Sequence, residues 1–83
     1  MADTGIPIHE HRTLDCIGLY CPTPVLKTRE EIDKIAIGDT LEVLADDPAA
    51  EEDIKAWAKR AGQRILEIAK TREGKRFLIQ RVK

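Results

Sequence analysis

Residues 41–62 read LEVLADDPAAEEDIKAWAKRAG, and their two periodicities indicate the architecture. Apolar and other residues alternate over residues 41–45, as expected of a half-buried strand. Asp46-Asp47-Pro48 then resembles a helix start, with an aspartate cap before a proline at the first helical position. The following apolar residues recur at helical spacing, and Gly62 is a typical left-handed helix stop. The stripe consists of Ile54, Trp57, Ala58 and Ala61.

The preceding segment predicts a strand and a helix. His11–Cys16 has the length of a short strand, which Gly18 interrupts. Pro22 and Pro24 can open a helix, although Pro24 also makes Thr23 a candidate cap. One helical face would carry Val25, Thr28, Ile32 and Ile35, and Gly38-Asp39 would end the helix before the strand at 41–45. Strand, helix and strand together predict a parallel crossover unit.

The remaining chain predicts an antiparallel hairpin, because residues 65–69 alternate, a turn lies near Glu73-Gly74, and residues 77–82 are again apolar. The element order is therefore β-α-β-α-β-β. We expect an α/β two-layer sandwich, with a four-stranded mixed sheet and two helices on one face. Residues 11–83 would form this domain, and residues 1–10, which contain Gly5 and Pro7, would be a flexible tail.

Composition excludes several classes of protein. The chain has 83 residues, of which 42% are hydrophobic and 35% charged, so it fits one small folded domain. It has no apolar run of about 20 residues and no signal-peptide pattern, so we expect a cytoplasmic protein without membrane contact. In that compartment its two cysteines are expected to be thiols.

The net charge of −1 conceals a segregation of charge. Residues 30–53 carry ten acidic residues and one basic residue, whereas residues 54–83 carry ten basic and two acidic residues. One interpretation is that acids begin helices and bases end them, as the helix dipole favours. The other is a surface of two signs for docking a protein or a nucleic acid.

Cys21-Pro22-Thr23-Pro24 is the motif most suggestive of chemistry. It places a thiol within a turn of a predicted helix N-terminus, where the dipole favours the thiolate, and its two prolines restrict the backbone. The alternative is a small buried residue at a helix start. A lone accessible cysteine is sufficient for thiol exchange, which needs no base.

Other interpretations of the cysteines have less support. A cysteine hydrolase needs a histidine base, and His9 and His11 lie in or beside the tail. The same histidines with Cys16 and Cys21 have irregular spacing for zinc, so we expect no metal and no cofactor. Cys16 could be a second, resolving thiol, but a small interior residue is the simpler interpretation. Asp46 and Asp47, at a strand end, are expected mainly to cap the next helix.

These residues resemble the TusA/SirA family of small sulfur-carrier proteins. The resemblance runs through nearly the whole chain after the tail, and the C-P-x-P element followed by D-D-P is its most specific part. The matching positions are Leu14-Asp15, Gly18-Leu19, Cys21 to Val25, Gly38-Asp39, Asp46-Asp47-Pro48, Asp53-Ile54 and Gly62. Three positions depart from the pattern: Lys55 and Gln63 replace a frequent proline and histidine, and Cys16 stands at a variable position.

The resemblance implies a sulfurtransferase or sulfur carrier that holds sulfane sulfur as a persulfide, or a thiosulfonate, on Cys21 and passes it to an acceptor thiol. Gly18, Pro22 to Pro24, Asp46 and Asp47 would support the site. The donor would be a cysteine desulfurase, a rhodanese or a DsrE-like protein, and the acceptor another sulfur-relay protein. Relatives serve tRNA thiolation, molybdenum-cofactor supply or sulfur oxidation.

We expect the free protein to be a monomer that does not itself bind nucleic acid. Two alternatives remain open. One is a nucleic-acid-binding or regulatory module that uses the basic C-terminal half. The other is a thiol redox sensor that uses Cys16 and Cys21.

Overall fold

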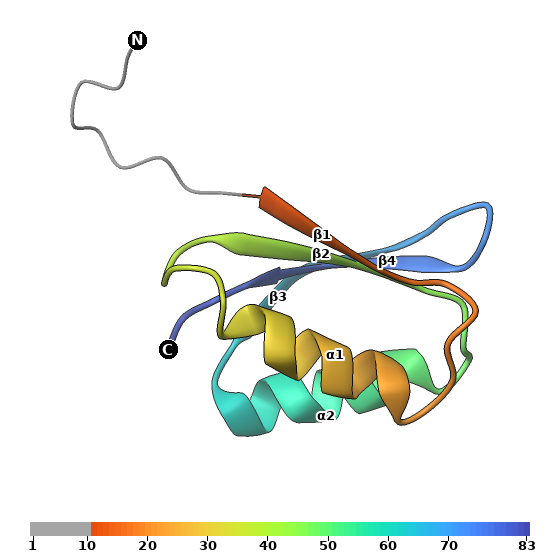
Figure 1. The fold of residues 1–83 in the computed structure, drawn as a ribbon, viewed down its shortest axis with the longest axis horizontal. Helices are drawn as coiled ribbons and strands as arrows, with labels where there is room; N and C mark the ends of the chain where they lie inside the picture. The colour runs from red at the N-terminus through yellow and green to blue at the C-terminus, as the bar shows by residue number, and fades with distance from the viewer. Residues whose placement is uncertain (1–10) are drawn as a thin grey trace, which may run out of the picture.

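The computed structural model describes residues 11–83, so the predicted tail, with His9, lies outside the described residues. Six elements follow one another in the predicted order β-α-β-α-β-β, and both helices lie on the same face of the sheet (Figure 1). They are β1 (His11–Cys16), α1 (Thr23–Ile32), β2 (Thr40–Ala45), α2 (Ala50–Ala61), β3 (Arg64–Lys70) and β4 (Lys75–Gln80).

The four strands form one mixed sheet in the order β1-β2-β4-β3. Strands β1 and β2 are parallel, and Cys16 pairs with Ala45 at the last position of their register. Strand β4 runs antiparallel to β2 on one side and to β3 on the other. The predicted two-layer α/β sandwich with a mixed sheet is therefore confirmed.

The core lies between the sheet and the helices. Leu41, Val43 and Ala45 alternate with partly exposed residues along β2, and Phe77 and Ile79 do so along β4. Trp57 on α2 is only 6% exposed, as its place on the apolar stripe predicted. Each helix can therefore bury its stripe against the inward face of the sheet.

Helix α1 differs from its sequence prediction at both ends. Pro22 occupies the N-cap position, no side chain caps the helix, and Thr23 is the first helical residue rather than the cap. The helix ends at Ile32, well before Gly38-Asp39, so Ile35 is buried from the connecting segment rather than from the helix. Apolar spacing alone could not distinguish a last helical turn from a buried loop residue.

Helix α2 begins later and ends as predicted. Its first residue is Ala50, and Ala49 occupies the N-cap position without a side-chain capping bond, so Pro48 is not the first helical residue. Gly62 has φ of 76°, the left-handed conformation that a glycine adopts most easily. The first turn is acidic and the last turn basic, as the helix dipole favours.

Strand β3 contains an irregularity that the alternating pattern did not predict. Its register with β4 shifts between Ile65 and Glu67, so Ile65 and Ile68 both pack against the core and Leu66 is exposed. A bulge of this kind inserts one residue on the bulged strand and thereby reverses the inward alternation.

Several basic residues of the C-terminal segment pair with acidic residues, most of which come from the acidic segment 30–53. Arg76 binds Glu42 at 3.1 Å and Glu67 at 3.0 Å across the outer face of the sheet. Glu51 on α2 pairs with both Lys55 and Lys75. Part of the basic C-terminal half therefore already has acidic partners within the fold. Within residues 11–83, no helix is both long and apolar enough to cross a membrane.

Candidate functional site

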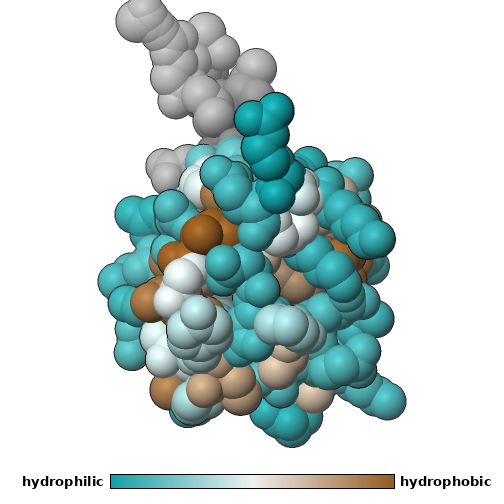
Figure 2. Space-filling model, turned by 90° about the vertical axis from the view of Figure 1, so that its right-hand side faces the viewer, coloured by the Kyte–Doolittle hydropathy of each residue, from teal (hydrophilic) through white to brown (hydrophobic). Residues whose placement is uncertain are grey.

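Cys21 lies in the loop between β1 and α1, at the end of the molecule where both helices begin (Figure 1). Its side chain is exposed, and its neighbour Tyr20 is 70% exposed. Cys16, by contrast, is completely buried in the hydrophobic core. Figure 2 faces this end of the molecule and shows apolar and polar side chains interspersed on its surface. Cys21 is therefore the thiol that a partner can reach.

The loop that carries Cys21 is held by the two aspartates that follow β2. Asp46 Oδ1 accepts a hydrogen bond from the Gly18 amide at 2.9 Å. Asp47 Oδ2 accepts one from the Cys21 amide at 2.5 Å, and Asp47 Oδ1 accepts one from the Ala49 amide at 3.0 Å. Two of these oxygens tie the β2–α2 loop to the loop that carries Cys21, and only Asp47 Oδ1 stays at the start of α2, so capping is not the main role of the pair.

This arrangement follows from the parallel pairing of β1 and β2. Because both strands end at the same edge of the sheet, the loops that follow them are neighbours. Gly18 has φ of 85°, which lets the chain turn between Cys16 and Cys21. In the sequence, the D-D-P motif directly after a strand marked Asp46 and Asp47 as candidate site residues. Their hydrogen-bond partners, the amides of Gly18 and Cys21, lie 28 and 26 positions earlier in the chain, so the sequence did not reveal these bonds.

Asp53, in the first turn of α2, influences the titration of the Cys21 thiol. Side-chain hydrogen bonding with Asp53 is the largest cause that raises the pKa of Cys21 above its ordinary value. Partial desolvation and the negative charges of Asp53 and Asp47 act in the same direction. In the sequence, Asp53 was distinguished only as part of the family pattern, and no role at the site was predicted for it.

The pKa of Cys21 is therefore shifted in the direction opposite to the one that the helix dipole alone would give. A helix N-terminus presents only about half a positive charge. Asp53 and Asp47 each carry a full negative charge, and both act on the sulfur. Helix α1 does begin beside Cys21, but Asp53 in the first turn of α2 and Asp47 in the β2–α2 loop raise the pKa of the thiol.

The remaining predicted site residues lie at the same end of the molecule. Pro22 is exposed, Thr23 is half-buried and Pro24 is buried at the start of α1. Burial raises the pKa of the Cys16 thiol, which Lys27 partly offsets. Both cysteines are free thiols. Pro24 thus anchors the start of the helix in the core while the adjoining Cys21 remains at the surface.

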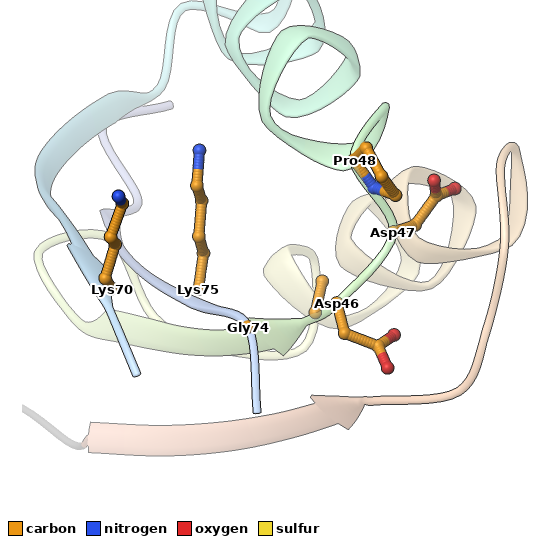
Figure 3. Close-up of a pocket in the computed structure, with 7 residues that line it drawn as sticks. Asp46, Asp47, Pro48, Lys70, Gly74 and Lys75 are labelled. Atoms are coloured by element: carbon orange, nitrogen blue, oxygen red, sulfur yellow. The ribbon is translucent and has the colours of Figure 1, made fainter. Parts of the chain in front are cut away.

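A pocket of about 300 Å³ lies on the other side of the β2–α2 loop (Figure 3). Lys70 and Lys75 extend side by side along it, whereas the carboxylates of Asp46 and Asp47 point away from both lysines. Asp47 thus contributes to the pocket wall while its side chain serves the Cys21 loop.

The described part of the chain offers no cluster of three or more His, Cys, Asp or Glu residues able to hold a metal ion. His11, one of the four ligands considered for zinc, lies on β1 and contacts Thr40 at 3.1 Å. Its other ring nitrogen lies 3.6 Å from Glu42. The site at Cys21 is thus composed of a thiol, carboxylates and backbone amides.

Comparisons with known proteins agree with this geometry. The profile of the family described as "Sulfurtransferase TusA" matches residues 12–81. A "Putative sulfur carrier protein" of Archaeoglobus fulgidus is 45% identical over 73 residues, which cover 87% of this chain and 95% of that protein. The "Putative sulfur carrier protein YrkI" of Bacillus subtilis is 36% identical over 70 residues, 84% of this chain and 93% of the relative.

A crystal structure of the SirA-like protein from Desulfitobacterium hafniense has the same fold, with a TM-score of 0.71 and 21% identity. The similarity covers 83% of this chain and 93% of that protein. Cys21 is an exposed cysteine before the first helix, at the edge of the sheet where the parallel strands β1 and β2 end. The family profile matches the chain over almost all described residues. The chain belongs to the TusA/SirA-like family of sulfur carrier proteins.

Proposed function

We propose that Cys21 is the residue that carries sulfur, as a persulfide, between a donor protein and an acceptor protein. The observation that supports this assignment is the contrast between the two thiols. Cys21 is exposed, whereas Cys16 is fully buried. Persulfide exchange requires access to the attacking sulfur, so only Cys21 meets this requirement in the folded protein.

The proposed reaction is a thiol exchange without net oxidation. Cys21 Sγ attacks the terminal sulfur of a donor persulfide, a new sulfur–sulfur bond forms, and the donor's own bond to that sulfur breaks. The Cys21 proton ends on the donor's released thiol. In the second half of the cycle an acceptor thiolate attacks the terminal sulfur in the same way and releases Cys21 as a thiol. A thiosulfonate would be carried on the same atom.

The surface around Cys21 supports docking by partner proteins. Tyr20 is 70% exposed beside it, and Leu26 is 47% exposed in the first turns of α1. Exposed apolar side chains next to a reactive group are typical of protein-interaction sites. We propose that donor and acceptor both contact this end of the molecule. The relay would operate in the cytoplasm and serve tRNA thiolation, molybdenum-cofactor supply or sulfur oxidation.

Mass spectrometry of the intact chain tests the assignment. After incubation with a low-molecular-weight persulfide, we expect the wild type to gain the mass of sulfur and Cys21→Ser to gain none. Cys16→Ala is the matched control and should still load, and alanine avoids burying a hydroxyl group without a partner. Loading of Cys21→Ser equal to that of the wild type would exclude Cys21 as the carrier residue.

A further inference from the structure

Two lysines lie directly opposite each other at the end of the β3–β4 hairpin. Lys70 ends β3, Lys75 begins β4, and the two are Cα partners in the hairpin register. Like charges in this arrangement repel and destabilise a sheet. The turn between them is held closed, because the Thr71 amide donates to the Gly74 carbonyl at 2.8 Å and the Gly74 amide to the Thr71 hydroxyl at 3.1 Å. The fold therefore keeps two cationic side chains side by side (Figure 3).

Acidic residues neutralise only part of this charge. Glu51 accepts a hydrogen bond from Lys75, but it also pairs with Lys55 at 2.9 Å, so one carboxylate is shared by two ammonium groups. Lys70 is exposed, and within residues 11–83 no ion pair joins it to a carboxylate. The lysine pair thus retains an excess of positive charge.

Both lysines line the pocket beside the β2–α2 loop (Figure 3). The uncharged part of its wall is formed by Ala45, Pro48 and Gly74. Asp46 and Asp47 also contribute to the wall, but their carboxylates accept amides of the loop that follows β1 and point away from the lysines. The volume of about 300 Å³ is at the lower end of the roughly 300–1,000 Å³ that ligand pockets occupy. The pocket therefore suits a small anion.

The charge and the residue type narrow the class of ligand. Two ammonium groups balance a dianion, whereas a carboxylate carries a single charge. Lysine binds phosphate as a point charge, and a planar carboxylate is better matched by the fork of an arginine. A phosphate monoester carries nearly two charges at neutral pH. Ala45 and Pro48 offer contacts to the organic part of such a molecule.

We propose that this pocket binds the phosphate group of a small molecule and that Lys70 and Lys75 hold it. The inference goes beyond the proposed function, since it involves no sulfur chemistry. Both ammonium groups would donate hydrogen bonds to phosphate oxygens, and the bound dianion would relieve their mutual repulsion. Asp47 already accepts the amides of Ala49 and Ala50 at the start of α2, so the lysines supply the donors.

An NMR titration of the full chain with glycerol 3-phosphate, at constant ionic strength, tests the proposal. We expect saturable shifts of the amide signals of Lys70, Gly74 and Lys75. Lys70→Gln removes one of the two ammonium groups and should weaken binding several-fold. Lys70→Glu places a carboxylate opposite Lys75 and should abolish binding. The affinity of the wild type should also fall below about pH 6, where the monoester takes up a second proton.

Lys59→Gln is the matched control. It removes the same charge from an exposed lysine in the last turn of α2, outside the pocket, and should bind like the wild type. Absence of a saturable shift would overturn the proposal. So would an equal loss in Lys59→Gln and Lys70→Gln, since Lys70 would then contribute only net charge or protection of the edge strand β3. Shifts caused by a single-stranded RNA but not by glycerol 3-phosphate would replace it with a nucleic-acid site.

Discussion

Replacing Gly74 with alanine should destabilise the fold and disturb the loop that carries Cys21. Gly74 lies in the β3–β4 turn, where its Cα approaches the end of β2 closely. A Cβ atom there would lie 2.3 Å from the carbonyl oxygen of Ala45 and 2.7 Å from Cα of Asp46. Both are backbone atoms and cannot rotate away, so the turn and the end of β2 must separate.

The size of the effect follows from this overlap. Ordinary contacts of a Cβ atom begin near 3.4 Å, so the backbone has to move by about 1 Å. Overpacking of this kind costs roughly 1–3 kcal/mol of the free energy of unfolding. For a domain of this size, each kcal/mol corresponds to a decrease of about 4–8 °C in the melting temperature.

Urea unfolding and thermal melting measure the destabilisation. Glu73→Ala is the matched control, because it changes an exposed residue of the same turn and should alter the free energy of unfolding by less than about 0.5 kcal/mol. NMR spectra of Gly74→Ala should also show shifted amide signals for Gly18 and Cys21, since Asp46 and Asp47 bind these amides. If Gly74→Ala were as stable as Glu73→Ala, the close approach would be refuted.

Two further predictions concern stability. The Lys75 and Lys55 ion pairs lower the pKa of Glu51 from 4.5 to about 2, so their contribution is present above pH 4.5 and is lost as the pH falls towards 2. The difference in unfolding free energy between wild type and Glu51→Gln should shrink over that interval, and a constant difference would contradict the ion pairs. Phe77→Ala, at a fully buried position, should cost about 3–5 kcal/mol in urea unfolding, whereas exposed Leu66→Ala should cost far less.

Local sequence patterns accounted for the elements and for the place of the exposed thiol. The alternation in residues 41–45 and the stripe from Ile54 to Ala61 predicted β2 and α2, and Gly62 ends α2 as expected. These signals are short-range, because side-chain direction repeats every two residues in a strand and about every 3.6 in a helix. The Cys21-Pro22-Thr23-Pro24 motif likewise located a thiol before a helix, within a few residues.

The predicted boundaries of the helices and the alternation of β3 were wrong where one residue type or spacing fits two local structures. Proline restricts the backbone at or just before a helix start without fixing the first residue: Pro22 is the N-cap of α1, whereas Pro48 precedes the N-cap of α2. Ile35 continues the apolar spacing of α1 but is buried from the segment after it. The bulge at Leu66 breaks an alternation that the sequence presents without interruption. Burial of each apolar residue was predictable, but the backbone that achieves it was not.

The sequence by itself thus determined the strands, the helices and the cysteine, whereas the tertiary structure alone decided the sheet order and the charge around the sulfur. Placing β4 between β2 and β3 requires contacts between distant segments. Asp47 and Asp53 act on Cys21 only because β1 and β2 are parallel and both helices begin at one end of the sheet. A helix dipole can be inferred from one element, but the carboxylates that oppose it come from another, so their effect depends on packing.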